Sequence, residues 1–173
     1  IMFPGGNAVN FAVYAKQCGE ESAYLGNIAD DIEGMLVYDS LGTLGVDVSY
    51  SQPKKEMVTE RCDVRLDYGD RVFVGCDYGD RGEEAWTPFK IEESHMDYIK
   101  SFDVIHCGCY ASMENEMYKL ADLKSVKTYD FSSEDEYRTD EYLEKVCPFI
   151  DIALFSAAEM GREAAKDVVE KVI

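Results

Sequence analysis

Strand-like and helix-like segments alternate regularly over the second half of the chain. Short apolar runs, each typical of a buried strand, cover residues 102–109, 126–131 and 150–155. Helical spacing of apolar residues covers 92–100, 114–123, 139–147 and 157–172. Strands separated by helices form a parallel sheet, and strands as apolar as these require cover on both faces. The sequence therefore predicts an α/β fold whose parallel sheet has helices on both faces.

The first fifty residues continue this alternation. Apolar residues at helical spacing predict one helix at 7–18 and a second at 32–44. Gly19 and Gly45 follow these segments and are expected to end them. Short strands are expected at 22–28 and 46–50.

Residues 57–79 differ in character from the rest of the chain. Charged and apolar residues alternate on both sides of a turn at 67–70, and no helix separates the two runs. This pattern predicts an antiparallel hairpin with one solvated face. The hairpin is either a small sheet inserted in the main domain or an ordinary edge hairpin, and these residues alone do not separate the two. We therefore divide the chain into an α/β domain, residues 1–56 and 80–173, and a hairpin, residues 57–79.

The composition excludes several classes of function. A chain of 173 residues, 46% of them hydrophobic, can form a domain with its own core. No apolar run is long enough to cross a membrane and no leader pattern occurs, so a cytoplasmic protein is expected. The net charge of −18 argues against nucleic acid or an anionic membrane as a partner, because both demand Lys and Arg. ATP is not excluded, because Mg²⁺ and helix N-termini can neutralise phosphates locally.

The six cysteines are interpreted as buried thiols of a reducing compartment. Only two histidines could join them in a zinc site, and a secreted disulfide framework normally occurs in a shorter chain with a leader sequence. Two of the six alternate on an apolar run and are expected to face one side of the sheet. The cysteines are Cys18, Cys62, Cys76, Cys107, Cys109 and Cys147.

A Gly-Gly pair opens the first helical segment and is followed by two amides, Asn7 and Asn10. Residues three apart share one helix face, so both amides can point the same way from the first turn. Amides donate and accept hydrogen bonds, and glycine permits close approach of a ligand, which suits a polyhydroxylated molecule. A simple turn followed by an Asn7 cap explains the same residues.

Two stretches, Gly5-Gly6-Asn7-Ala8-Val9-Asn10-Phe11-Ala12 and Ala29-Asp30-Asp31-Ile32-Glu33-Gly34, resemble the N-terminal sugar-binding signature of the ribokinase-like (PfkB) carbohydrate kinases. The family has Gly where this chain has Ala29. If that position needs an unusual backbone angle, Ala29 would be strained.

Four further stretches resemble one branch of that family, the fructoselysine 6-kinases. They begin at Asp70, Phe102, Tyr129 and Asp151, and they occur in the order of that branch. The resemblance implies a ribokinase-like, Rossmann-type parallel sheet with a small β-sheet lid, and it favours the lid interpretation of the hairpin. It also implies transfer of the γ-phosphate of ATP, with Mg²⁺, to a hydroxyl of fructoselysine or a related sugar.

Family motifs carry candidate roles onto several residues. Sugar contacts are implied for Gly6, Asn7, Asn10, Asp30, Arg71, Phe73 and Tyr110. Asp31 is better explained as the cap of the helix that follows it. Tyr110 stands where many relatives have Glu, and an aromatic residue suits an amine-linked or bulkier substrate. Arg71 and Phe73 could equally be a solvated charge and a residue of the hairpin's own packing.

The nucleotide phosphates and Mg²⁺ are expected near a second group of residues: Asp130, Ser156 and Glu159. Ser156 and Glu159 match in position an Asn-x-x-Glu motif of the family, with Ser replacing Asn. A capping box explains the same pair, because Ser followed three residues later by Glu is its pattern. Asp130 could instead be a capping carboxylate.

The family's Asp-Thr-x-Gly-Ala-Gly-Asp signature and its first strand do not occur in these residues. The resemblance therefore implies a catalytic Asp beyond Ile173, and we expect the 173-residue chain alone to phosphorylate nothing. Two alternatives are a non-catalytic sugar-binding half-kinase and a nucleoside kinase of the same fold. A homodimer through the lid sheet is also expected, because an edge strand invites pairing.

Overall fold

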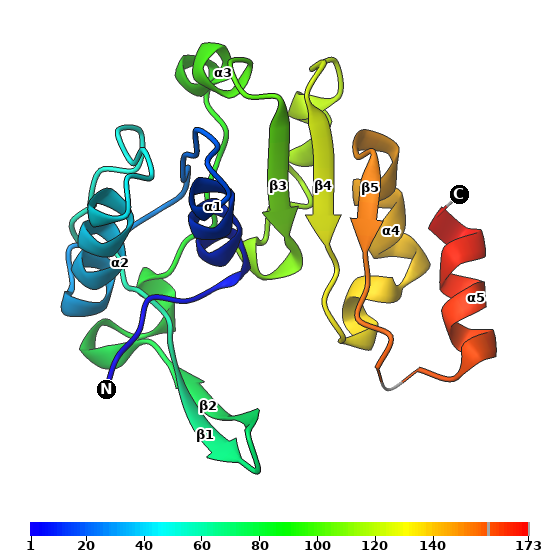
Figure 1. Cartoon of the computed structure of the whole chain (residues 1–173), viewed down its shortest axis with the longest axis horizontal. Coiled ribbons are helices and arrows are strands. Elements are labelled where there is room, and N and C mark those ends of the chain that lie inside the picture. The colour runs from blue at the N-terminus through cyan, green and yellow to red at the C-terminus, as the bar shows by residue number, and fades with distance from the viewer. Residues whose placement is uncertain (159, 173) are drawn as a thin grey trace. The chain divides into compact units, whose positions relative to one another are not determined.

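A computed structural model describes residues 1–158 and 160–172. The chain divides into two compact units, Ile1–Thr87 and Pro88–Ile173. Unit 1 contains two helices and two strands, together with short 3-10 turns at Gly79–Arg81 and Glu83–Ala85. Its main elements are α1 (Asn7–Gln17), α2 (Ile32–Thr43), β1 (Arg61–Asp67) and β2 (Asp70–Asp77) (Figure 1).

The two helices of unit 1 confirm the predictions at 7–18 and 32–44. They pack through a small apolar cluster of Val9, Ala12, Leu41 and Val46. The strands predicted at 22–28 and 46–50 are wrong. The two segments are joined only by one isolated parallel bridge, between Ala23 and Asp47, and a second isolated bridge joins Ala29 to Lys54. Gly26 lies within the first of these segments and weakens it as a strand.

The predicted hairpin is confirmed as an antiparallel pair, β1 and β2. Tyr68 and Gly69 both have positive φ, 47° and 94°, as a tight two-residue turn requires. The expectation of one solvated face is wrong, because every residue of both strands is exposed. A β-bulge between Asp63 and Val64 shifts the pairing by one residue.

The bulge brings Cys62 directly opposite Cys76, and the two form a disulfide. The prediction of buried thiols is therefore wrong for this pair. It is confirmed for Cys107 and Cys109, and burial raises the pKa of each thiol to about 12. Cys147 is half-buried and Cys18 is exposed.

Polar contacts fix the base of the hairpin within unit 1. The Asp31 carboxylate accepts hydrogen bonds from the Thr59 amide at 2.7 Å and from the Thr59 hydroxyl at 2.8 Å. Arg61 pairs with Glu33 at 2.9 Å, and Arg81 donates to the Met57 carbonyl. The hairpin is thus tied to α2 at its base while its strands extend into solvent.

Unit 2 contains a three-stranded parallel sheet in the order β3-β4-β5 (Figure 1). This confirms the predicted parallel sheet. Two helix predictions fail in detail: residues 114–123 form only a 3-10 turn, Met117–Leu120, and the last helix begins at Arg162 rather than near 157. The elements are α3 (Glu93–Ile99), β3 (Val104–Gly108), β4 (Val126–Asp130), α4 (Asp140–Val146), β5 (Ile152–Leu154) and α5 (Arg162–Val172).

The core of unit 2 is built on the central strand β4. Tyr129 and the following Phe131 are fully buried, and their rings lie 4.7 Å apart. Phe131 also stacks on Phe155 at a centroid distance of 4.5 Å. Neighbouring residues of β4 point to opposite faces, and Thr128 and Tyr129 are both buried, so β4 has cover on both faces.

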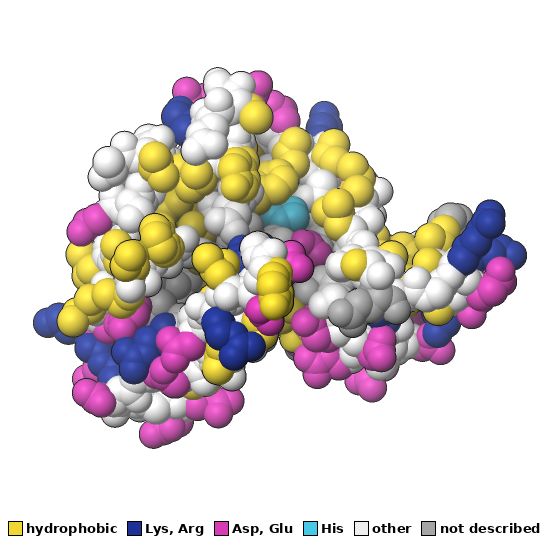
Figure 2. Space-filling model, turned by 60° about the horizontal axis from the view of Figure 1, so that its bottom comes forward, with side chains coloured by type: hydrophobic (Ala, Val, Ile, Leu, Met, Phe, Trp, Pro, Cys, Tyr) yellow, Lys and Arg dark blue, Asp and Glu magenta, His cyan; other side chains and the backbone are white. Residues whose placement is uncertain are grey.

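The surface agrees with the acidic composition. Asp and Glu side chains are spread over the face drawn in Figure 2, in agreement with the net charge of −18. Within residues 1–158 and 160–172 we find no helix with the length and apolar character of a membrane span.

Candidate sugar and nucleotide site

The predicted site residues fall into two sets. Gly6, Asn7, Asn10, Asp30 and the hairpin residues belong to unit 1, and the remaining residues belong to unit 2. Each set is described within its own unit.

The Gly-Gly pair stands directly before α1, as the sequence predicts. Gly6 is the residue before the helix, with φ 98°, a left-handed conformation that favours glycine. Asn7 is the first helical residue, so the alternative in which Asn7 caps the helix is wrong. Asn7 is half-buried and Asn10 is exposed, and both stand on the first turn. Their roles toward a sugar stay predictions.

In the second part of the signature, Asp30 and Asp31 make different contacts. Asp31 is the N-cap of α2 and accepts from the Gly34 amide at 2.8 Å, which confirms the cap interpretation. Asp30 lies one residue earlier and pairs with Arg81 at 2.8 Å. Ala29 is buried and has no positive φ, so the replacement of the family's Gly causes no backbone strain.

Gly34 closes the signature for a steric reason. A Cβ atom built on Gly34 would stand 2.2 Å from the Ala29 carbonyl oxygen and 2.8 Å from the Thr59 hydroxyl. Only glycine fits there. Gly34 therefore allows α2 to pack closely against the segment that carries Asp30.

Arg71 and Phe73 lie on β2, where Arg71 pairs in register with Leu66 and Phe73 pairs with Val64. Both are exposed, and Phe73 leaves 65% of its surface accessible. Their contact with substrate stays a prediction.

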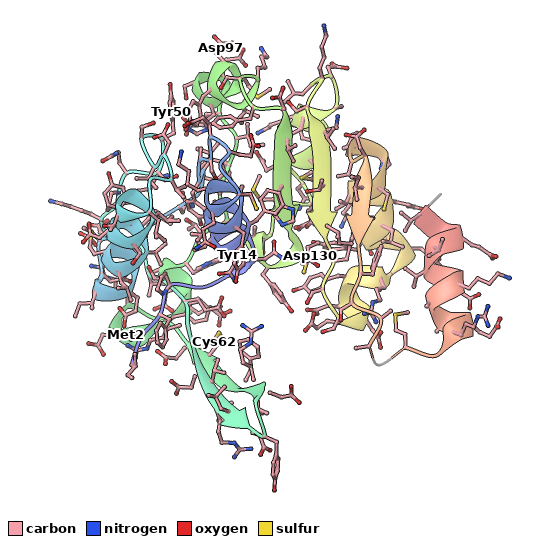
Figure 3. The ribbon with its side chains drawn as sticks, viewed as in Figure 1. Met2, Tyr14, Tyr50, Cys62, Asp97 and Asp130 are labelled. Carbon is pink, nitrogen blue, oxygen red and sulfur yellow. A yellow bond between two sulfur atoms is a disulfide. The ribbon has the colours of Figure 1, made fainter. Side chains whose placement is uncertain are left out.

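In unit 2, the carboxyl ends of the strands gather a set of polar side chains. Ligands of parallel α/β sheets bind beyond these ends. Tyr110 follows β3, and its hydroxyl lies 2.8 Å from the Ser132 hydroxyl, which follows β4. Asp130 ends β4 (Figure 3), and its carboxylate accepts the Ser132 amide at 2.8 Å. Ser132 has φ 57°, a left-handed conformation that is uncommon outside glycine and recurs at functional sites.

Glu134 completes this cluster, which we name the strand-end cluster: Tyr110, Ser132 and Glu134. Burial raises the pKa of Glu134, but hydrogen bonds from Tyr110 and Ser132 outweigh that effect and lower it. Glu134 is therefore ionised near neutral pH. Burial raises the pKa of Tyr110 to about 12, and the neighbouring Glu134 contributes to the rise. The cluster thus combines a carboxylate with neutral hydroxyls.

Ser156 follows β5 and joins the same edge of the sheet through the backbone. Its amide donates to the Ser132 carbonyl at 2.9 Å, and its carbonyl accepts from Arg138 at 2.8 Å. The capping-box alternative is wrong for Ser156, because the helix begins only at Arg162. Glu159 lies outside the described residues.

Ser132, Glu134 and Arg138 are site-edge residues that the sequence reasoning missed. The Arg138 side chain is only 9% exposed, and it reaches the backbone at the ends of two strands. Arg138 is a charged residue in a stretch of charged and polar residues, so the sequence did not indicate that its side chain would be buried. Ser132 could have been found, because it follows Asp130 by two residues at the end of a predicted strand.

Comparison with known proteins identifies the family. The family described as "pfkB family carbohydrate kinase" matches residues 2–172. This match covers nearly the whole chain, and the chain belongs to the pfkB family of carbohydrate kinases.

Individual relatives agree with the family. The chain is 31% identical over 169 residues to fructosamine kinase FrlD of Bacillus subtilis, covering 97% of this chain and 57% of that protein. It is 29% identical over 157 residues to fructoselysine 6-kinase of Escherichia coli, covering 91% of this chain and 57% of that protein. The chain therefore spans little more than half the length of these relatives.

A solved structure is similar in fold and is likewise matched over little more than half of its length. The ribokinase of Arabidopsis thaliana, complexed with ribose and ATP, superposes with a TM-score of 0.71 at 17% identity, covering 97% of this chain and 56% of that chain. The fold is ribokinase-like, as the sequence predicted.

Proposed function

We propose that this chain is the sugar-binding part of an ATP-dependent kinase that phosphorylates fructoselysine, or a related amine-linked sugar, on its 6-hydroxyl. The observation that carries the proposal is family membership together with the two relatives, a fructosamine kinase and a fructoselysine 6-kinase. The strand-end cluster supports the amine-linked class of substrate. The catalytic Asp that the family uses is proposed to lie beyond Ile173.

The start of α1 is the proposed sugar contact. Gly6 has no side chain, so a sugar ring can approach the backbone there, and the amides of Asn7 and Asn10 supply donors and acceptors for hydroxyls. Asp30 is assigned to the same task, although it must share its carboxylate with Arg81. Arg71 and Phe73 are proposed to cover the substrate from the hairpin, acting as a lid.

The strand-end cluster is the proposed site for the ammonium of an amine-linked sugar. An ionised Glu134 attracts a cation, and the exposed ring of Tyr110 can hold an ammonium over its face. A neutral sugar such as fructose lacks this charge. We therefore expect the cluster to raise affinity for the amine-linked sugar and to leave fructose binding nearly unchanged.

ATP and Mg²⁺ are the proposed cofactors. Asp130 and Ser156 present oxygen atoms at the strand ends, and oxygen is the donor that Mg²⁺ takes. When bound, Mg²⁺ would neutralise charge on the phosphates. Asp130 is half-buried and held by the Ser132 amide, so its carboxylate is already oriented. Glu159 is proposed to lie near Mg²⁺ and the nucleotide phosphates, as the family motif implies.

The test begins with the intact mass of the protein isolated from its natural host, with peptide mapping of its C-terminus. ATP consumption is then measured with fructoselysine, fructose and adenosine. The proposal expects turnover with fructoselysine well above the other two. Preference for adenosine would favour the nucleoside-kinase alternative, and sugar binding without turnover would favour the non-catalytic half-kinase.

Two variants test the substrate class within this protein. Glu134→Gln keeps the shape and removes the charge, and it should raise KM for fructoselysine roughly tenfold, equivalent to ~1.4 kcal/mol, with little change for fructose. Glu144→Gln removes an exposed charge on α4 and should change neither value. Equal losses for both sugars in the Glu134 variant would contradict a role in recognising the amine.

A homodimer through the hairpin and a cytoplasmic location are further proposals. The hairpin exposes the apolar side chains Val64, Leu66, Val72, Phe73 and Val74, which a second copy could cover. Sedimentation of the protein, with Phe73→Asp as the disrupting variant, measures this association. A monomer at micromolar concentration would contradict it.

A further inference from the structure

Three metal-ligating side chains meet at one place on the hairpin. The ligand atoms of Glu60, Cys62 and Cys76 all lie within 4.8 Å of one another. All three residues are exposed, so ions and small molecules in solution can reach them. The sugar and nucleotide roles assigned above use none of them.

The strand geometry explains why these three side chains converge. Glu60 and Cys62 are two residues apart in extended chain and therefore point to the same side. The β-bulge places Cys76 directly opposite Cys62, as the register of β1 and β2 records. Arg61, between Glu60 and Cys62, points the other way and pairs with Asp77 at 2.8 Å and with Glu33 at 2.9 Å. These ion pairs hold the backbone on the face away from the three ligands.

A neighbouring tyrosine orients the carboxylate. The Tyr78 side chain makes a hydrogen bond with Glu60 and follows Cys76 by two residues. An outer-shell hydrogen bond of this kind restricts the rotation of a ligating carboxylate and improves a metal site.

The donor set indicates which ion would bind. Two thiolates and one carboxylate suit a thiophilic divalent cation such as Zn²⁺, with water completing four-coordination, and do not suit Mg²⁺ or Ca²⁺. Thiolates are required for such binding, and a disulfide cannot supply them. The Cys62–Cys76 disulfide therefore represents the form that is closed to metal.

We propose that Glu60, Cys62 and Cys76 form a binding site for a thiophilic divalent cation in the dithiol form of the hairpin, and that oxidation to the disulfide closes this site. In the closing step the two thiols lose two protons and two electrons and form one S–S bond. A small-molecule disulfide takes up these protons and electrons and leaves as two thiols. A dithiol reductant reverses the exchange. A reducing compartment keeps the site open.

The test titrates Cd²⁺, an optical probe for thiolates, into the full chain without oxygen. One sample is reduced with a phosphine, which brings no competing thiol, and the other keeps its disulfide. The reduced chain should show a saturable ultraviolet charge-transfer band at one equivalent, and Zn²⁺ should displace Cd²⁺. Bound metal should protect Cys62 and Cys76 from alkylation, as read by peptide mass spectrometry.

Variants assign the ligands. The double variant Cys62→Ser/Cys76→Ser should lose the band, and Glu60→Gln should keep the fold and weaken binding roughly tenfold, by ~1.4 kcal/mol. Cys18→Ser removes another exposed thiol and should leave the titration unchanged. The proposal is overturned if the reduced chain gives no saturable band, if the band survives in the double variant, or if the disulfide form binds Cd²⁺ equally well. None of these readouts depends on kinase activity.

Discussion

The hairpin β1–β2 and the central strand β4 are both rich in β-forming residues, yet they are stabilised in different ways. Every residue of the hairpin is exposed, including Val72, Phe73 and Val74. In β4 the three residues from Lys127 to Tyr129 are buried. The hairpin depends on its own ladder, its disulfide and polar contacts at its base, whereas β4 depends on burial of large side chains.

This difference shows that apolar residues do not have one meaning along this chain. Tyr129 in β4 and Phe131 directly after it are committed to a core, and replacing either should cost stability. The apolar residues of the hairpin contribute little to folding and remain available for a substrate or a partner. The following predictions test that separation, beginning with the largest effect.

The largest effect is expected for Phe131→Ala. Phe131 is fully buried and stacked on Phe155, so truncation removes buried area and leaves a cavity, at ~3–5 kcal/mol. Phe73→Ala on the hairpin should cost under ~0.5 kcal/mol, because its ring is already exposed. Urea unfolding of both variants measures the contrast. Equal losses would show that the hairpin is packed against something in solution.

Gly34→Ala should have the next largest effect. The new methyl group would press on the Ala29 carbonyl, and relieving that overlap should cost ~1–3 kcal/mol. Gly42→Ala is the matched control in the same helix. A Cβ at this position would meet nothing within 4 Å, so this change should raise the stability of the protein by ~1 kcal/mol. Thermal unfolding distinguishes the two. A neutral Gly34→Ala would mean that α2 can move away from this segment.

Asp31→Ala should cost ~1–2 kcal/mol through loss of the helix cap, and it should also loosen the base of the hairpin. Hydrogen exchange at Thr59 and Gly34 reports both effects. Asp39→Ala, an exposed acid later in α2, should change neither amide. Unchanged exchange at Thr59 would show that other contacts suffice.

The same carboxylate predicts a pH dependence. Burial raises the pKa of Asp31, but bonds from Thr59 and Gly34 and the charge of Arg81 lower it more. A folded-state pKa below the unfolded value gives stability that is present above ~4 and is lost as pH falls through the folded value. The protection of the Thr59 amide, measured relative to its intrinsic exchange rate at each pH, should therefore fall in acid, and Asp31→Asn should remove that dependence.

Tyr68→Asn should have the smallest effect. Tyr68 has φ 47° at the hairpin turn, and Asn before Gly is favoured in that conformation. The change should stabilise the hairpin by ~0.5 kcal/mol and slow amide exchange in β1 and β2 without affecting β4. Faster exchange in the hairpin would contradict this account of the turn.

The parallel sheet, both helices of unit 1 and the hairpin were predictable because each depends on local periodicity. The disulfide was not. A regular two-residue hairpin would pair Cys62 with Gly75, and only the bulge shifts its partner to Cys76. Spacing alone could not reveal that shift.

The site was predictable only in part. The start of α1 directly after the Gly-Gly pair was predictable, because it depends on local spacing, whereas the positive φ of Gly6 came only from the structure. The strand-end cluster depends on which strands neighbour one another, and the roles of Ser132 and Glu134 depend on side-chain directions. Residues 114–123 form only a 3-10 turn, and directly before it the Glu116 carboxylate accepts a hydrogen bond from the Ile91 amide and pairs with Lys119.

The contacts of the hairpin base determine where this hairpin can bend. Thr59 is held by Asp31, Arg61 is held by Glu33, and Arg81 holds the returning chain through Asp30. A hinge at the root would have to break several of these bonds together. The bulge at Asp63 and Val64 interrupts the ladder beyond them. If the hairpin acts as the lid that we propose, its closure would therefore flex the outer half, which carries Arg71 and Phe73, while the root stays in place.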